Sequence, residues 1–256
     1  MATTNPQKGE DMDASDRITH PGESLFERIQ TVCIGKPRVA ILMSGGGSNA
    51  RKILDERYRY PNFDFIAIGT DNPGFHGAKL ARDFDLAWVL TEHWDHVPFD
   101  RSAYFGALAD SFHQLGINLV LYAGFMKIAP RVFLHEFPGI NIHPADLTIV
   151  NDQYQPKYTG LNAVAYAVKA GESYIASTIH VVDETVDGGT IIAVSKHVPL
   201  LLEGLSELHE LQEKLKQTGE HTLYPQVLAL LSRGKITKDM LPLHAEHQDL
   251  NALFYS

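Results

Sequence analysis

The sequence predicts an α/β protein in which a doubly wound, mostly parallel sheet carries an antiparallel hairpin at one edge. Two observations lead to this fold class. From Pro37 onward, short runs that are apolar throughout alternate with longer amphipathic stretches, and strands of that kind are covered by helices on both faces. Later in the chain, two apolar runs flank "ETVDGG", whose Asp-Gly-Gly is strong turn chemistry and favours a hairpin.

The first half of the chain contains the clearest alternation of strands and helices. Each apolar run is short enough to be a buried strand, and the stretches between the runs place apolar residues at helical spacing. The predicted strands are 38–44, 63–70, 86–91 and 117–124, and the predicted helices between them are 48–59, 74–84 and 100–115.

The second half continues this pattern and then changes it. A strand is predicted over 139–144 and a helix over 160–170. The runs 174–183 and 189–198 are expected to pair as the hairpin, and 205–232 is mostly helical in pattern.

The chain is predicted to hold one large domain over 37–236 with an addition at each end. Residues 1–36 form an N-terminal extension. Residues 1–22 of it are polar and are expected to be disordered or loosely attached, whereas 21–35 has the apolar spacing of a helix that packs on the domain. Residues 237–256 form a tail without an informative pattern.

Composition limits the partners of the chain. The formal net charge of −9 argues against nucleic-acid binding, which needs clustered Lys and Arg. Cys33 is the only cysteine, so an intrachain disulfide is excluded, which suits a reducing cytosol. No stretch approaches the roughly 18 uninterrupted apolar residues of a membrane span, and the N-terminus lacks an apolar signal core. We therefore expect a cytoplasmic monomer or homodimer that binds small molecules, with no nucleic-acid or membrane partner.

The motif "ILMSGGGSNA" ends the first strand and opens a helix, where free N–H groups and the helix dipole favour an anion. Three interpretations stay open. Gly45, Gly47 and Ala50 satisfy the dinucleotide fingerprint, and Asp71 ends the second strand. The loop could instead hold one substrate phosphate, or be a tight turn with Ser48 as the helix N-cap. A Walker-type loop is excluded, because no Lys-Ser or Lys-Thr follows the glycines.

A second group of polar residues lies far from this loop in the sequence. In "INIHP", strand alternation sends Asn141 and His143 to the same face, and Asp187 lies on the hairpin turn. An amide donor, an imidazole and a carboxylate suit acyl transfer to an amine without a Ser or Cys nucleophile. Two alternatives remain: a core histidine beside a turn-forming aspartate, or a metal site made by His143, His180 and Asp187.

Several motifs in the same order carry a resemblance to a known family. They are "VAILMSGGGSN", "YAGFMKIAP", "GINIHP", "PKYTGLNAVAYAVKAGE", "STIHVVDETVDGGTII" and "QTGEHTLYPQVL". Together they resemble the folate-dependent formyltransferases over about residues 37–236, which implies a Rossmann-like formyltransferase fold. The resemblance implies formyl transfer from 10-formyltetrahydrofolate to the amine of glycinamide ribonucleotide in purine synthesis. A different small amine, such as an amino-sugar nucleotide, is the alternative acceptor.

The resemblance also assigns roles to residues, and it implies no metal. The family's catalytic residues fall on Asn141, His143 and Asp187. Its contacts to the substrate phosphate and ribose fall on Gly47, Ser48, Asn49, Gln217 and Glu220, and its folate contacts fall on Met126, Lys127, Ile128, Val182, Asp183 and Glu184.

Two departures from the family pattern concern the site. An insertion at 145–156 follows "NIHP" and is expected to border the acceptor pocket. Lys127 stands where Arg is common, and a point charge in place of a planar fork alters the expected folate contact. A nicotinamide-dependent oxidoreductase would explain the glycine loop but leaves "NIHP" and "VDGG" without a role.

Overall fold

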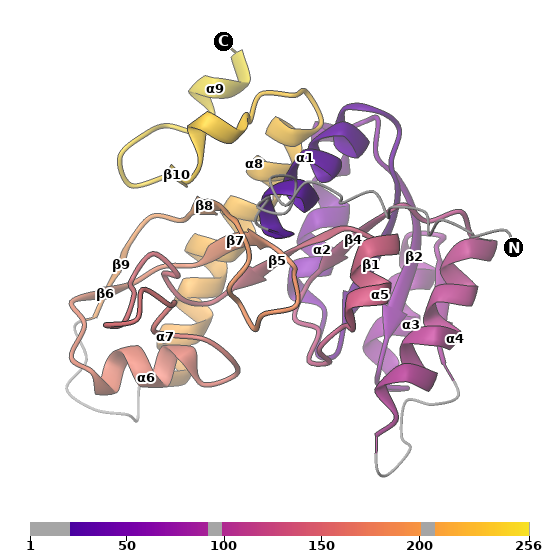
Figure 1. Ribbon diagram of the computed structural model, residues 1–256, viewed down its shortest axis with the longest axis horizontal. Helices are drawn as coiled ribbons and strands as arrows, with labels where there is room; N and C mark the ends of the chain where they lie inside the picture. The colour runs from indigo at the N-terminus through magenta and orange to yellow at the C-terminus, as the bar shows by residue number, and fades with distance from the viewer. Residues whose placement is uncertain (1–20, 92–98, 201–207, 256) are drawn as a thin grey trace, which may run out of the picture.

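The computed structural model describes residues 21–91, 99–200 and 208–255 (Figure 1). An eight-stranded sheet forms the centre, in the order β10-β8-β7-β5-β4-β1-β2-β3. The pairings of β7 with β5 and with β8 are antiparallel, and the other pairings in this sheet are parallel. The predicted α/β class with a mostly parallel sheet is therefore confirmed.

The first five strands run parallel to one another; they begin in the middle of the sheet, with β1, and extend from it in both directions. They are β1 (Arg38–Met43), β2 (Asp64–Thr70), β3 (Ala87–Leu90), β4 (Leu119–Tyr122) and β5 (Gly139–His143). The chain proceeds from β1 to β2 and β3 on one side and returns to β4 and β5 on the other. This reversal makes the junction of β1 and β4 a topological switch point, where open α/β sheets bind ligands beyond the strand ends.

Alternate residues of these strands pack into two separate hydrophobic cores. Val39 and Ile41 of β1 face one core, which includes residues of the helices α1 (Pro21–Ile34), α2 (Ser48–Asp55) and α8 (His221–Leu231). Ala40 and Leu42 face the opposite core, beneath α4 (Arg101–Gln114) and α5 (Arg131–Glu136). Burial on both faces explains why these strands are apolar at every position.

A third core lies beside the hairpin end of the sheet, where Figure 1 shows α6 and α7 together. It contains residues of α6 (Ala163–Lys169) and α7 (Leu208–Leu215). A π-helical turn, η4 (Lys216–Glu220), joins α7 to α8. The remaining helical segments are α3 (Phe75–Asp83), α9 (Ala252–Tyr255), η2 (Arg57–Arg59) and η5 (Lys238–Met240).

The hairpin is present as β7 (Thr178–Val181) and β8 (Ile191–Val194), but each strand is shorter than predicted. The outer parts of the two apolar runs form a separate small sheet of β6 (Tyr174–Ile175) and β9 (Val198–Pro199). The division occurs where the Ser177 N–H donates to the Ser195 side-chain Oγ, at 2.9 Å, in place of a backbone carbonyl.

The termini add elements to the sheet and to its cover. The helix predicted over 21–35 is confirmed as α1, whereas the prediction for 1–20 lies outside the described residues. In the tail, β10 (Leu243–His244) pairs with β8 and thus lies outside the hairpin at the edge of the sheet. No helix in the described ranges combines the length and apolar character needed to cross a membrane.

Candidate functional site

A cavity of about 560 Å³ opens at the carboxyl ends of the parallel strands, beside the switch point. Its walls are the loop after β1, the loop after β4, the end of β5, the loop between β7 and β8, and η4. Twelve of the fourteen residues that the sequence assigned to the site line this cavity, including all three predicted catalytic residues. The two that do not are Glu184 and Gln217.

The glycine loop enters the cavity through a left-handed turn. Gly47 has φ 73° and is the N-cap of α2, so Ser48 is the first helical residue. The interpretation of Ser48 as the N-cap is therefore wrong, because the chain needs a left-handed residue there and glycine adopts that conformation at low cost. The N-terminal turn of α2 carries no acidic residue, which leaves its positive end suited to an anion.

Asn49, in the first turn of α2, contacts the π-helical turn. Its Nδ2 donates to Oε2 of Glu220 at 2.5 Å, and both side chains are buried. Burial raises the pKa of Glu220, and the hydrogen bond from Asn49 partly offsets this effect. Lys216, on the same turn, also lines the cavity and adds a positive charge that the sequence analysis did not assign.

His143 lies at the end of β5 with an acceptor at each ring nitrogen. Nε2 lies 2.8 Å from the Tyr158 carbonyl oxygen, and Nδ1 lies 3.3 Å from Oδ2 of Asp187. Because a carbonyl accepts only, Nε2 carries the proton in the neutral ring. Burial lowers the pKa of His143, whereas the negative charge of Asp187 acts to raise it. The geometry therefore provides partners for both N–H groups of the imidazolium.

Asp187 holds its position with an uncommon backbone conformation, φ 54°. Its Oδ2 accepts from the Gly160 N–H at 2.7 Å, and its Oδ1 lies 3.6 Å from Nε2 of His180. Burial acts to raise the pKa of Asp187, but His180, His143 and the Gly160 N–H together hold it below its ordinary value. A carboxylate is thus maintained beside His143.

Asn141 and His180 are opposite each other on the paired strands β5 and β7. Nδ2 of Asn141 lies 3.1 Å from Nε2 of His180, and Nδ1 of His180 lies 2.9 Å from the Val181 carbonyl oxygen. The Val181 carbonyl requires a proton on Nδ1, so Nε2 of neutral His180 accepts from Asn141. The second N–H of the Asn141 amide stays available to a ligand. The sequence alone did not predict this orienting contact.

The metal alternative involves three of these residues. His143, His180 and Asp187 do meet, but no cluster within the described ranges has the arrangement of donors that would hold a metal ion.

The lining of the cavity also contains most of the residues expected to contact folate. Met126, Lys127 and Ile128 follow β4, and Val182 and Asp183 follow β7. The exposed fractions of Met126 and Ile128 are 56% and 51%, so this wall offers a large apolar surface.

Two side chains in this region are held by other groups. Lys127 lies 4.0 Å from the Asp71 carboxylate and over the Phe99 ring. Glu184 instead pairs with Arg131 at 3.1 Å, outside the cavity.

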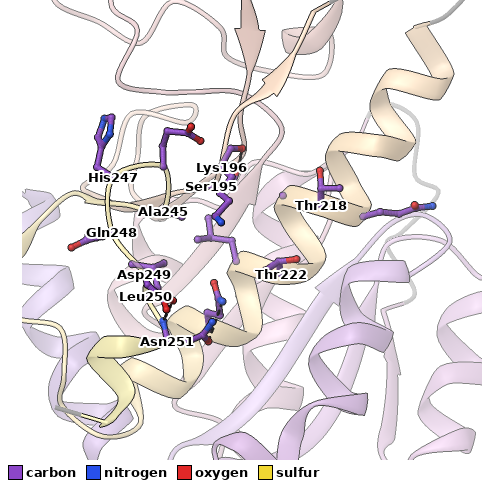
Figure 2. Close-up of a pocket in the computed structure, with 15 residues that line it drawn as sticks. Ser195, Lys196, Thr218, Thr222, Ala245, His247, Gln248, Asp249, Leu250 and Asn251 are labelled. Carbon is purple, nitrogen blue, oxygen red and sulfur yellow. Dashed lines mark hydrogen bonds between the residues drawn. The ribbon is translucent and has the colours of Figure 1, made fainter.

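Gln217 lines a second cavity, of about 640 Å³, between η4 and the C-terminal tail. Figure 2 shows the residues that line this cavity, with Thr218 and Thr222 on the helix and His247 and Asp249 on the tail loop. The turn η4 thus separates two cavities, with Lys216 and Glu220 on the first and Gln217, Thr218 and Gly219 on the second.

The insertion at 145–156 folds beside the site without lining the first cavity. Val150 and Pro156 form an isolated antiparallel bridge, and the Lys157 N–H donates to the Ile149 carbonyl at 2.8 Å. The insertion therefore folds back on itself and leads directly into the residues that contact His143 and Asp187.

Comparisons with known proteins agree with this arrangement. The chain is 30% identical over 205 residues to phosphoribosylglycinamide formyltransferase of Haemophilus influenzae, a match that covers 78% of this chain and 89% of that protein. It is 31% identical to the trifunctional purine biosynthetic protein adenosine-3 of Drosophila melanogaster, covering 78% of this chain but only 14% of that protein's length.

A solved structure has the same architecture. The phosphoribosylglycinamide formyltransferase of Anaplasma phagocytophilum superposes with a TM-score of 0.66 at 27% identity, over 82% of this chain and 98% of that one. The family model described as "Formyl transferase" matches residues 37–228, which include the glycine loop, the end of β5 and the hairpin turn. The chain therefore belongs to the formyl transferase family.

Proposed function

We propose that the chain transfers a formyl group from 10-formyltetrahydrofolate to the amine of glycinamide ribonucleotide, a step of purine synthesis. The observation that carries the proposal is the meeting of Asn141, His143 and Asp187 in one cavity that the glycine loop also lines. The names of the relatives support this acceptor, and the chain's own residues supply the chemistry.

The reaction begins when the amine nitrogen attacks the formyl carbon of the donor. A carbon–nitrogen bond forms, and the formyl oxygen becomes an oxyanion. The free N–H of the Asn141 amide donates to this oxygen, and the positive charge of the nearby His143 imidazolium stabilises it electrostatically, so the tetrahedral intermediate is favoured. The intermediate collapses when the bond between the formyl carbon and N10 breaks. N10 leaves protonated, and the acceptor becomes a formamide.

Asp187 keeps His143 charged and takes part in moving the amine proton. Its carboxylate faces Nδ1 of His143 at 3.3 Å, so it favours the imidazolium over the neutral ring. The amine loses a proton as it is acylated, and N10 gains one as it leaves. A carboxylate with a lowered pKa beside the reacting groups can accept the first proton through water or directly.

The glycine loop is proposed to hold the substrate phosphate, away from the reacting carbon. Gly47 caps α2, Ser48 and Asn49 begin it, and the N–H groups of these residues lie at the positive end of the helix dipole. Lys216 approaches the same side of the cavity from η4, and Glu220 is placed to accept from a ribose hydroxyl. The apolar wall formed by Met126, Ile128 and Val182 suits the flat pterin ring of the donor.

We also propose that the protein acts in the cytoplasm, as a monomer or a homodimer. The single cysteine, Cys33, is buried in the first core, and burial raises the pKa of its thiol. A buried, protonated thiol is unreactive and forms no disulfide, which suits a reducing compartment. Sedimentation equilibrium over a hundredfold range of concentration would distinguish the two assembly states.

An assay of folate-dependent formylation tests the proposed activity. Glycinamide ribonucleotide is compared as acceptor with a panel of amino sugars and amino-sugar nucleotides, and formation of tetrahydrofolate is followed with the formylated product. We expect turnover with the ribonucleotide alone. Turnover on an amino-sugar nucleotide only would refute this acceptor and leave the formyl-transfer mechanism intact.

A further inference from the structure

Residues 157–160, here called the strap, contact two of the three catalytic side chains through backbone atoms. The Tyr158 carbonyl accepts from Nε2 of His143 at 2.8 Å, and the Gly160 N–H donates to Oδ2 of Asp187 at 2.7 Å. A shift of the strap would therefore move partners of His143 and Asp187 together.

The strap is itself attached to Glu172 by side-chain contacts. The Tyr158 hydroxyl donates to Oε1 of Glu172, and Nζ of Lys157 lies 3.0 Å from the same oxygen. The Tyr158 ring is buried in the third core, which also contains residues of α6.

The position of Glu172 is in turn set by the end of α6. Gly171 has φ 73°, its N–H donates to the Val168 carbonyl, and the Glu172 N–H donates to the Ala167 carbonyl at 3.2 Å. This pair of contacts is a Schellman-type helix end, which fixes the residue that follows the glycine. Glu172 therefore connects a rigid helix terminus to the strap.

Glu172 does not line the cavity that contains Asn141, His143 and Asp187. Its carboxylate is engaged by Tyr158 and Lys157, so any effect on the reaction must pass through the strap.

We propose that Glu172 is a positioning residue for formyl transfer, acting through Tyr158 to hold the two backbone groups that orient His143 and Asp187. The inference rests on the proposed function, because these two side chains are assigned there to the reaction. Supporting groups of this kind matter because catalytic side chains need to stay within about 0.5 Å of their productive positions.

The effect of removing Glu172 should appear in kcat rather than in KM. The strap contacts groups that act on the reacting carbon, whereas substrate binding depends on the glycine loop and the apolar wall. A misplacement of 1 Å can cost about a hundredfold in rate, and we expect a partial loosening to lower kcat roughly tenfold.

The test compares four variants of the full-length chain. Glu172→Ala removes the acceptor, and Tyr158→Phe removes the donor, so both should lower kcat by a similar factor, and the double variant should be no worse than either one. Glu172→Gln keeps an oxygen that accepts from the Tyr158 hydroxyl and should retain kcat within about twofold. Asp64→Asn, which breaks an exposed pair with Arg38 far from the strap, is the matched control for loss of a surface carboxylate.

A second measurement does not depend on turnover. Proton NMR of the ring N–H of His143 reports its hydrogen bond to the Tyr158 carbonyl, and we expect its exchange with solvent to be faster in Glu172→Ala and Tyr158→Phe than in Glu172→Gln. If Glu172→Ala lowers only Tm, and leaves both kcat and this exchange rate at the level of Asp64→Asn, the positioning role is refuted. If the unaltered chain formylates no amine, the proposed function fails while the exchange measurement still decides the role of Glu172.

Discussion

Nδ2 of Asn49 lies 2.5 Å from Oε2 of Glu220, a contact that ties the helix after the glycine loop to the π-helical turn. The two residues are 171 positions apart in the sequence, and both are buried. Through this contact, two walls of the cavity are held at a fixed separation.

Glu220→Gln is expected to make the protein more stable at neutral pH. Burial raises the pKa of Glu220 in the folded protein, so the folded state binds this proton more tightly than the unfolded chain does. The free energy of unfolding therefore falls as pH rises from the pKa of Glu220 in the unfolded chain through its pKa in the folded protein. The variant lacks this loss of stability. Urea unfolding from pH 4 to 8 measures the free energy of unfolding of both proteins. Glu210→Gln, an exposed position on α7, should leave the pH profile as it is.

Gly47→Ala should both destabilise the protein and weaken phosphate binding. An alanine Cβ would lie 2.7 Å from Cε of Met43, and the φ of 73° is strained for any residue with a Cβ. We expect a loss of about 1–2 kcal/mol in unfolding free energy, with KM for the phosphate-bearing substrate raised several-fold and kcat little changed. The measurements are denaturant unfolding and steady-state kinetics.

Gly46→Ala is the matched control for this variant. An added Cβ at Gly46 meets nothing within 4 Å, and its φ is not in the left-handed region. Equal KM values for the Gly46 and Gly47 variants would contradict the assignment of the phosphate to the left-handed turn.

Asp187→Asn should change both the rate and its pH dependence. Asparagine tolerates the left-handed backbone of this residue, so the fold of the turn is retained. We expect kcat to fall by about 10²- to 10⁴-fold, the range for loss of a group in proton transfer. Since Asp187 acts against the burial that lowers the pKa of His143, that pKa should fall further in the variant.

The pH profile provides the check on this mechanism. The proposed reaction uses the imidazolium of His143, so the rate declines as pH rises through its pKa, and the decline should occur at lower pH in Asp187→Asn. Asp187 also contributes to stability, because its pKa is lower in the folded protein than in the unfolded chain. This contribution is present above the pKa of the carboxyl in the unfolded chain, and it is lost as pH falls through the pKa in the folded protein. A decline at the same pH in both proteins would mean that Asp187 does not influence His143.

The strands and the meeting of the candidate catalytic residues could be predicted from local sequence for a physical reason. In β1, Val39 and Ala40 face opposite cores, and a strand covered on both sides has to be apolar at every position. Asn141 and His143 are two residues apart on one strand, so alternation alone brings them to one face. Signals of this kind need no knowledge of the tertiary fold.

Other features depend on contacts between distant residues and have no local signal. The interruption at Ser177 arises because the Ser195 hydroxyl replaces a ladder carbonyl, and β10 is a pair of residues whose only apolar member is Leu243. The six-residue helix α5 is too short to show a clear helical period. The contact of Asn49 with Glu220, likewise, is visible only once the chain has folded.

The two neighbours Lys216 and Gln217 are expected to behave differently as alanine variants. Lys216 lines the cavity with the glycine loop, and Gln217 lines the cavity next to the tail. Lys216→Ala should raise KM for glycinamide ribonucleotide roughly tenfold, as loss of about 1.4 kcal/mol from a charged contact would. Gln217→Ala should change KM less than twofold. The opposite order would show that Gln217 turns toward the phosphate when substrate binds, as the family resemblance implies.

Helix α1 precedes the region that matches the family model, yet its inner face is part of the first core. Phe26 and Ile29 are fully buried there, against a core that includes residues of α8. Phe26→Ala should therefore lower the free energy of unfolding by about 3–5 kcal/mol, the cost of a large cavity in a packed core. Because no described residue of α1 lines the cavity that contains Asn141, His143 and Asp187, kcat of the folded variant should match that of the unaltered chain. Ile34→Ala, at a position 55% exposed on the same helix, should change stability by less than about 0.5 kcal/mol. Equal stability of the two variants, measured by denaturant unfolding, would mean that α1 rests on the domain without supporting it.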